Sequence, residues 1–289
     1  MNAAITTLSS RDCQLGEGPI YDPVQDTLYW FDILRQELLC HSFATGSTKV
    51  EKLPFMASAM ALVSDQEHML FCDHGLYLRH IHSGALRLYL RLEADNPITR
   101  SNDARVHPCG AFWLGTMGRN LEPGAGSIYW LFKGELKVLF EAITCPNSIC
   151  FAPDGTVAYF TDSMENILYH VRCDPRSGLP IEEPRVFFDN RNLGGALDGS
   201  VVASDGTLWN ARWGCNSLDA YSPEGERIRS IELPAKQLTC PAFIGNRIAV
   251  TSAWDGQNPE ERASDPFAGN TFLLEAAIAG QAEPRLRLE

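Results

Sequence analysis

Short apolar and aromatic runs recur along the whole chain, separated by turn-forming residues. Runs such as TLYWFD, AFWLGT and VAYFTD are rich in aromatic and β-branched residues, and Gly, Pro, Asp and Asn stand between them. This pattern is typical of β-strands joined by tight turns. Residues 270–279, NTFLLEAAIA, could be taken for an amphipathic helix, but a final strand fits them equally well. The sequence therefore predicts an all-β protein.

Four polar residues each stand just before a few apolar residues, a turn and a strand. They are Glu17 in LGEGP, Asn102 in RSNDARV, Asn147 in PNSICFAPDG and Asp198 in LDGSVVASDG. With further starting points near Met60 and Pro241, the successive intervals are 42 to 51 residues. Such intervals are close to the roughly 40–50 residues of a four-stranded propeller blade. The sequence predicts one six-bladed β-propeller domain over residues 1–289, because radial repetition closes the stack of sheets and limits exposed edges.

These four residues are expected to meet at one mouth of the central channel, since the first strand of each blade lines that channel. Two carboxylates and two amides facing one another there would be costly without a cation or hydrogen bonds. A divalent metal with oxygen ligands would remove that cost. The alternative for each residue alone is an ordinary turn residue that bonds its own backbone. Glu17 argues against it, because Glu is a poor turn residue and the glycines on both sides let a ligand approach closely.

Composition narrows the classes of function. The 289 residues are 45% hydrophobic and 21% charged, and the net charge of −12 comes without any Lys/Arg-rich run. We therefore expect neither nucleic acid nor an anionic membrane as a partner. The sequence has no apolar stretch of the roughly 20 residues that a membrane helix needs, and its first residues lack the pattern of a secretory signal. Nine cysteines without a CxxC pair indicate reduced thiols in a cytoplasmic protein.

Motifs of several other enzyme classes are missing from the sequence. It contains no HExxH zinc motif, no GxSxG serine elbow and neither a GxGxxG nor a Walker loop. A serine nucleophile and a nucleotide cofactor are therefore not expected.

The order of the segments resembles the regucalcin (senescence marker protein)/gluconolactonase family of six-bladed propellers, with bacterial sugar-lactone hydrolases nearest. The matching text is LGEGPIYDPVQDTLYWFDI, TRSNDARVHPCGAFWLGTM, GSIYW, PNSICFAPDGTVAYFTDS, LDGSVVASDGTLWNARWG and AGNTF, which spans nearly the whole chain. The resemblance implies that Glu17, Asn147 and Asp198 are metal ligands and that Asp198 is also the general base.

The same resemblance assigns residues to the substrate. Arg100 and Asn102 match the family's substrate-contacting pair, and Glu122 in EPGAGSIY matches a carboxylate on the substrate side. The implied reaction is hydrolysis of an aldonic-acid lactone to the open sugar acid, with a small-molecule sugar lactone as the partner. The sequence is consistent with a monomer. One divalent metal ion is the implied cofactor. Ca²⁺ is favoured, and oxygen ligands also admit Mg²⁺, Mn²⁺, Zn²⁺ or Fe²⁺.

Two alternatives stay open at this point. One is metal-dependent hydrolysis of another ester or of a phosphotriester, and the other is a non-catalytic calcium-binding propeller. The presence of Asp198 together with Arg100 and Asn102 favours an enzyme, because a binding scaffold has no need of all three beside a metal.

Overall fold

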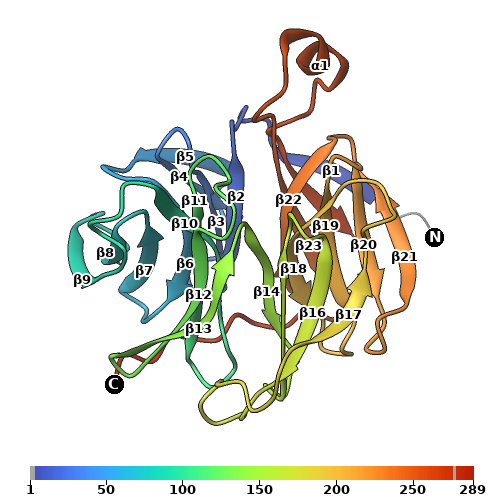
Figure 1. Cartoon of the computed structure of the whole chain (residues 1–289). Helices are drawn as coiled ribbons and strands as arrows, with labels where there is room; N and C mark the ends of the chain where they lie inside the picture. Colours follow the sequence, from blue (N-terminus) through green and yellow to red (C-terminus); the bar gives the residue numbers. More distant parts are fainter. Residues whose placement is uncertain (1–3, 276–277) are drawn as a thin grey trace.

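The structure, a computed structural model, describes residues 4–275 and 278–289, which form 24 β-strands and one short helix, α1 (Pro259–Ser264). Four sheets have four strands each and a fifth sheet has eight. Figure 1 shows the sheets standing around the middle of the molecule. The all-β, propeller-like architecture predicted from the strand pattern is confirmed.

The four-stranded sheets are built from consecutive strands. The first contains β2 (Gly16–Asp22), β3 (Thr27–Asp32), β4 (Glu37–Ser42) and β5 (Ser47–Lys52). The second contains β6 (Ala57–Leu62), β7 (Glu67–Cys72), β8 (Gly75–His80) and β9 (Leu86–Arg91). The third contains β10 (Thr99–Val106), β11 (Phe112–Gly118), β12 (Gly126–Phe132) and β13 (Glu135–Ile143). The fourth contains β14 (Pro146–Phe151), β15 (Val157–Asp162), β16 (Ile167–Arg172) and β17 (Arg185–Asp189).

The eight-stranded sheet differs from the predicted set of six separate four-stranded sheets. Its strands are β18 (Ala196–Val202), β19 (Leu208–Trp213), β20 (Ser217–Tyr221), β21 (Arg227–Glu232), β22 (Gln237–Ile244), β23 (Arg247–Ala253), β24 (Thr271–Glu275) and β1 (Ala4–Ser9). The pairing of Trp213 with Gln237 joins β19 to β22, and thereby the strands β18–β21 to the other four. Strand β1 pairs with β24, so the first strand of the chain lies in the same sheet as the last. The strand expected over residues 270–279 is thus present as β24, and residues 276–277 lie outside the described residues.

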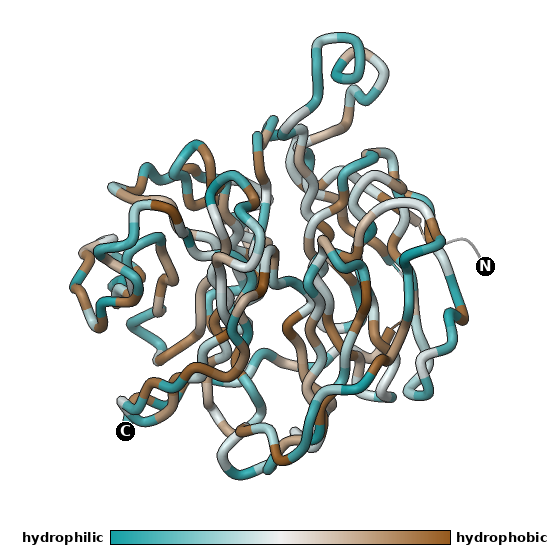
Figure 2. Tube along the Cα trace, in the orientation of Figure 1, coloured by the Kyte–Doolittle hydropathy of each residue, from teal (hydrophilic) through white to brown (hydrophobic). Residues whose placement is uncertain are grey.

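Six inner strands pack against one another in a closed ring. Strand β2 contacts β6, and the series continues through β10, β14 and β18 to β22, which contacts β2 again. Apolar clusters fill the space between neighbouring sheets, and alternate residues of one strand belong to different clusters. In β3, Tyr29 and Phe31 belong to one cluster, while Leu28 and Trp30 belong to the next. Because both faces of such strands are covered, they read in the sequence as continuous apolar runs. Figure 2 shows hydrophobic colour concentrated along strands and hydrophilic colour at many of the turns.

Each inner strand has an irregularity in its pairing close to the polar position singled out in the sequence. In β2, β14 and β18 the shift begins at Glu17, Asn147 and Leu197, and in β10 it begins at Ser101. In β6 the shift falls between Ala57 and Ala59, slightly before the starting point expected near Met60. In β22 it falls between Leu238 and Pro241, and it ends at the starting point expected near Pro241. A bulge bends the strand and redirects a side chain. The repeated irregularity therefore turns the polar side chains away from the sheet pattern.

The two ends of the ring of inner strands are covered differently. The loop that carries α1 follows β23 and extends beyond the sheets at the end where the inner strands begin (Figure 1). Residues 278–289 cross the opposite end, where the backbone N–H of Leu286 donates to the carbonyl of Leu62 and the side chain of Gln281 donates to the carbonyl of Val202, both at 2.8 Å. Leu62 and Val202 are the last residues of β6 and β18. None of the helices in the described part of the chain is long and apolar enough to cross a membrane.

Candidate active site

A cavity of about 420 Å³ opens at the end of the ring where the inner strands begin. Five of the six residues singled out from the sequence line it: Glu17, Arg100, Asn102, Asn147 and Asp198. They come from four different inner strands, β2, β10, β14 and β18. The structure thus brings together residues that are up to 181 positions apart in the sequence.

Asn147 is held with its amide oxygen in a defined direction. Its Nδ2 donates to Ser163 Oγ at 2.9 Å, and that hydroxyl donates to the carbonyl of Leu197 at 2.7 Å. The hydroxyl oxygen is therefore an acceptor toward Asn147, which fixes the NH₂ end of the amide. Asn147 Oδ1 accepts from Asn102 Nδ2 at 3.1 Å and keeps one lone pair for another partner.

Asn102 and Arg100 continue this chain of hydrogen bonds. Asn102 Nδ2 also donates to the carbonyl of Pro146 at 2.9 Å, and its Oδ1 accepts from Arg100 Nη1 at 3.0 Å. Arg100 Nη1 donates as well to the carbonyl of Ser101 at 2.8 Å. A guanidinium can only donate and a carbonyl can only accept, so both amide orientations are determined.

Asp198 is the most unusual carboxylate of the cavity. It is 6% exposed, and its Oδ1 is buried without a hydrogen-bond partner in the described residues. Its backbone carbonyl, in contrast, accepts from Ser148 Oγ at 2.5 Å and from Asn210 Nδ2 at 2.9 Å. The backbone of Asp198 is therefore fixed while one side-chain oxygen is left for a group other than this protein's own donors.

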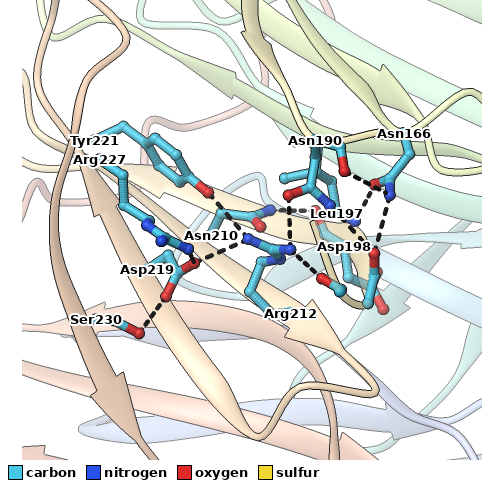
Figure 3. A network of polar contacts seen from close by, with 12 residues as sticks. Asn166, Asn190, Leu197, Asp198, Asn210, Arg212, Asp219, Tyr221, Arg227 and Ser230 are labelled. Atoms are coloured by element: carbon cyan, nitrogen blue, oxygen red, sulfur yellow. Dashed lines mark hydrogen bonds and ion pairs between the residues drawn. The ribbon is translucent and has the colours of Figure 1, made fainter. Parts of the chain in front are cut away.

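A buried polar network stands behind Asp198 and supports its strand (Figure 3). Arg212 donates to Asp219 Oδ2 at 2.9 Å and to Asn190 Oδ1 at 2.7 Å. The backbone N–H of Leu197 donates to Asn166 Oδ1 at 3.0 Å. Hydrogen bonds among buried polar groups make a structure rigid, so the network holds the start of β18 in place. One of its atoms, Arg212 Nε, has no partner in the described residues.

Burial and like charges act on the carboxyl groups of the site. Burial raises the pKa of Asp198 well above its usual range, and the charges of Glu17 and Asp103 raise it further. Burial also raises the pKa of Glu17, although Gly18 N–H donates to its Oε2 at 2.9 Å and opposes the shift. The side chain of Glu17 is partly exposed, but it faces the cavity and not the outer surface. Two carboxylates held this way attract a cation.

Glu122 lies beside the cavity and is not among the residues that line it. Its two carboxylate oxygens accept from the backbone N–H and the Nδ2 of Asn120, both at 2.9 Å. Asn120 does line the cavity, so Glu122 supports a wall of the site. A direct contact between Glu122 and a substrate stays a prediction.

Among the cavity-lining residues that were not predicted from the sequence, four share a position in the sheets: Arg119, Ser163, Trp213 and Asp255. Arg119 and Ser163 directly follow β11 and β15, which are second strands of their sheets. Trp213 is the last residue of β19, and Asp255 lies two residues after β23. Second strands run antiparallel to the inner strands, so they end at the mouth where the inner strands begin. Polar residues after those strands could have been found by this rule.

In the described part of the chain, one group of three His, Cys, Asp or Glu side chains lies close enough together to hold a metal, and it lies apart from this cavity. It consists of Cys72, Asp73 and His74. Asp73 Oδ2 already accepts from Arg119 Nη2 at 2.8 Å, and the ring nitrogens of His74 are 2.8 Å from Asp73 Oδ1 and 3.0 Å from the hydroxyl of Tyr77. Because these groups satisfy one another, the cluster is a set of hydrogen bonds that positions Arg119.

The chain is similar to known proteins over nearly its whole length. The model of the SMP-30/Gluconolactonase/LRE-like region matches residues 15–253. The chain is 42% identical to a protein of Rhizobium meliloti (strain 1021) named "Putative sugar lactone lactonase", over 98% of this chain and 97% of that one. It is 33% identical to an L-arabinolactonase of Azospirillum brasilense, over 97% and 94% of the two chains.

A solved structure shares the fold closely. The crystal structure of a calcium-binding protein, regucalcin, from Agrobacterium tumefaciens strain C58 is 46% identical and superposes with a TM-score of 0.98, covering 100% of this chain and 99% of that one.

Proposed function

The chain belongs to the SMP-30/Gluconolactonase/LRE-like family, and on this premise we propose that it is a sugar lactonase that uses a divalent metal ion to open an aldonic-acid lactone to the free sugar acid. Relatives over the full length carry lactonase names, which supports the reaction. The observation that carries the proposal is the buried Asp198 Oδ1, which has no partner among residues 4–275 and 278–289, beside a second carboxylate and an oriented amide oxygen.

The fold is best understood as six blades. The two halves of the eight-stranded sheet are joined by one residue pair, and six inner strands contact one another in a ring. On this interpretation, Glu17, Asn102, Asn147 and Asp198 come from the first, third, fourth and fifth blades. The metal ligands are thereby supplied by blades that meet at one mouth of the channel.

The donor set fits a divalent cation. Asp198 and Glu17 supply carboxylate oxygens, and Asn147 supplies an amide oxygen whose direction is fixed by Ser163 and Asn102. Hard oxygen ligands of this kind suit Ca²⁺, and the calcium-binding relative of known structure agrees with that choice. When bound, such an ion supplies Lewis-acid polarisation of the lactone carbonyl and stabilises the negative charge that develops on it.

The protein's own residues supply the remaining functions. Asp198 accepts the proton of the attacking water, since its carboxylate is buried at the cavity and has a free lone pair. Arg100 and Asn102 bind ring hydroxyls, and their hydrogen bonds to each other hold both groups in position. The chemical demand is modest because a lactone is an ester and already reactive.

A pH-drop assay with a set of aldonolactones tests the proposal. The protein is stripped of metal, assayed, and assayed again after addition of Ca²⁺, Mn²⁺, Mg²⁺ or Zn²⁺. We expect hydrolysis that disappears on stripping and returns with at least one ion. Hydrolysis that is equally fast in the stripped protein would refute the metal dependence, and no hydrolysis under any condition would refute the lactonase assignment.

A further inference from the structure

Two guanidinium groups line the same wall of the cavity. Arg100 lies on β10, and Arg119 follows the end of the neighbouring strand β11. Arg100 is paired with Met117 across the two strands, and the backbone N–H of Arg119 donates to the carbonyl of Ile98 at 2.8 Å. The two cations are therefore held on one sheet by backbone structure.

Arg100 is a buried cation that forms no ion pair in the described part of the chain. It is 8% exposed, and its printed hydrogen bonds run from Nη1 to two oxygen atoms that belong to Ser101 and Asn102. Within residues 4–275 and 278–289, no carboxylate lies within 4.0 Å of it, and its Nε and Nη2 donate to no protein group. Burial lowers the pKa of Arg100 and the charge of Arg119 acts in the same direction, whereas Cys145, Glu17 and Asp255 oppose the shift. A buried charge without a partner is costly, so this position favours an anion.

Arg119 is anchored so that part of its guanidinium remains available. Its Nη2 donates to Asp73 Oδ2 at 2.8 Å, its Nε donates to the carbonyl of Pro97 at 3.1 Å, and its Nη1 is 3.4 Å from Met56 Sδ. A guanidinium has five N–H donors, and these contacts use three of them. The side chain is 30% exposed, so the other two donors can bind a ligand without further ordering of the side chain.

The charge balance of the cavity points the same way. Its carboxylates are Glu17, Asp198 and Asp255, and its cations are Arg100 and Arg119. A divalent cation on Glu17 and Asp198 would leave Arg100 and Arg119 beside Asp255 in the cavity, and Arg119 is also paired with Asp73, which lies outside the cavity lining. Arg100 is thus the guanidinium that has no carboxylate within 4.0 Å in the described residues, and an anionic substituent would supply one where a neutral sugar lactone would not.

We propose that the substrate carries an anionic oxyacid group, a carboxylate, sulfonate or phosphate, at the end remote from the lactone carbonyl, and that Arg119 binds this group together with Arg100. The inference rests on the lactonase function proposed above and specifies its substrate class. Planar guanidinium groups match these oxyanions through paired N–H donors, which makes the contact directional as well as charged.

The test compares lactones that differ at one position. A neutral aldonolactone with a terminal hydroxymethyl group is assayed beside the matched lactones that carry a carboxylate, a sulfonate or a phosphate there. We expect kcat/KM for at least one anionic lactone to exceed that for the neutral one by tenfold or more. Comparison of the carboxylate, sulfonate and phosphate lactones identifies which oxyanion fits best.

The variant Arg119→Met removes the charge and keeps most of the side-chain volume. We expect it to lower the ratio of anionic to neutral kcat/KM by about 10- to 100-fold, mainly through KM, because hydrogen bonds to charged groups contribute about 1.5–3 kcal/mol. Arg119→Lys keeps the positive charge but lacks the paired N–H donors of a guanidinium, so it should retain part of the ratio. The control is Arg87→Met on the outer strand β9, where the side chain is 67% exposed and is not among the residues that line the cavity; it should leave the ratio unchanged.

A binding measurement separates this inference from the proposed function. Isothermal calorimetry compares an open-chain sugar diacid with the matched monoacid on the metal-loaded protein, and we expect tighter binding of the diacid that is lost in Arg119→Met. Equal or better turnover of the neutral lactone, with a ratio that Arg119→Met does not change, would overturn the inference and leave the lactonase intact. If no lactone is hydrolysed, the proposed function fails, and equal binding of the two acids would then overturn the anion site as well.

Discussion

The two ends of the central ring of strands differ in whether their buried charges form ion pairs. At the closed end, Arg105 Nη1 donates to Glu283 Oε1 at 2.5 Å, and these side chains are 11% and 12% exposed. The C-terminal segment that carries Glu283 also covers this end with Leu286, which is 3% exposed. At the open end, Asp198 has a buried oxygen without a partner and Arg100 has no counter-ion in the described residues.

This difference separates scaffold from site. The scaffold pairs Arg105–Glu283 and Arg212–Asp219 meet inside the chain, whereas at the open end Asp198 and Arg100 are held in place without an ion-pair partner in the described residues. Asp219 and Asp198 show the contrast in one sheet: Asp219 is 1% exposed and is bound by Arg212 at 2.9 Å and by Ser230 at 2.5 Å. Unpaired buried charges destabilise a protein unless a ligand compensates them, so we interpret the open end as built for a cation and a substrate.

The largest effect is expected from Asp198→Asn. We predict a loss of turnover of roughly 1,000-fold or more, because the proposed general base is removed. The melting temperature of the metal-free protein should stay the same or rise, since an uncompensated buried charge disappears. Lactone turnover and thermal unfolding are measured on the same preparation, and wild-type turnover in the variant would exclude Asp198 as the base.

Asp219→Asn is the matched change in the scaffold. It leaves Arg212 buried with a weaker partner, and breaking a buried ion pair costs about 3–5 kcal/mol. We predict a loss of that order in the free energy of unfolding, measured by urea denaturation. A variant as stable as the wild type would show that the ion pair of Asp219 does not stabilise the fold, and the contrast between scaffold and site would fail.

Glu283→Gln tests the closed end. Arg105 would lose its short charged hydrogen bond, and we predict destabilisation of about 1–3 kcal/mol with no change in metal affinity. Chemical denaturation and a metal titration give the two quantities. A change in metal affinity without a change in stability would mean that the two ends are coupled in a way the present comparison does not include.

The smallest effect concerns His107, which lies directly after β10 at the closed end. The backbone N–H of Cys109 donates to its Nδ1 at 3.1 Å, and its Nε2 is 2.8 Å from the carbonyl of Gly155, so the neutral ring with the proton on Nε2 fits both partners. Burial lowers the pKa of His107 below the ordinary value of 6.5. A group whose pKa is lower in the folded than in the unfolded chain stabilises the fold at pH values above the unfolded pKa. This stabilisation is lost as the pH falls through the folded pKa.

We therefore predict that the contribution of His107 to stability is lost as the pH falls below about 6.5, so that the difference in stability between the wild type and His107→Gln shifts in favour of the variant over this range. Thermal unfolding between pH 7.5 and pH 5 measures it. An identical pH dependence in His107→Gln and the wild type would contradict the assignment.

The sequence predicted the fold well because the strands are covered on both faces. Runs such as TLYWFD are apolar at every position, since Leu28 and Trp30 face one neighbouring sheet and Tyr29 and Phe31 the other. The near-regular spacing of the inner strands also located four cavity residues. The eight-stranded sheet was not predictable in the same way, because the contact of Trp213 with Gln237 depends on how closely two neighbouring strands approach.

The site was predicted only as far as it lies on the inner strands. Arg119 and Asp255 follow second strands, and no repeat marks them in the sequence. Glu122 was assigned by local similarity of the loop, whereas the structure places its carboxylate behind Asn120. The role of residues 278–289 was hidden as well, because only the short alternation RLRLE marks the segment in the sequence, and its hydrogen bonds go to strand ends that are distant along the chain.

The most direct test of the account is a calorimetric titration of Ca²⁺ into metal-stripped protein, for the wild type and for Glu17→Gln. The central claim is that the unpaired charges at the open end hold one divalent cation. We predict one binding site per chain in the wild type and a dissociation constant at least about tenfold higher in Glu17→Gln, because ligand charge sets calcium affinity. An unchanged dissociation constant in the variant, or no binding of any divalent ion to the wild type, would contradict the claim.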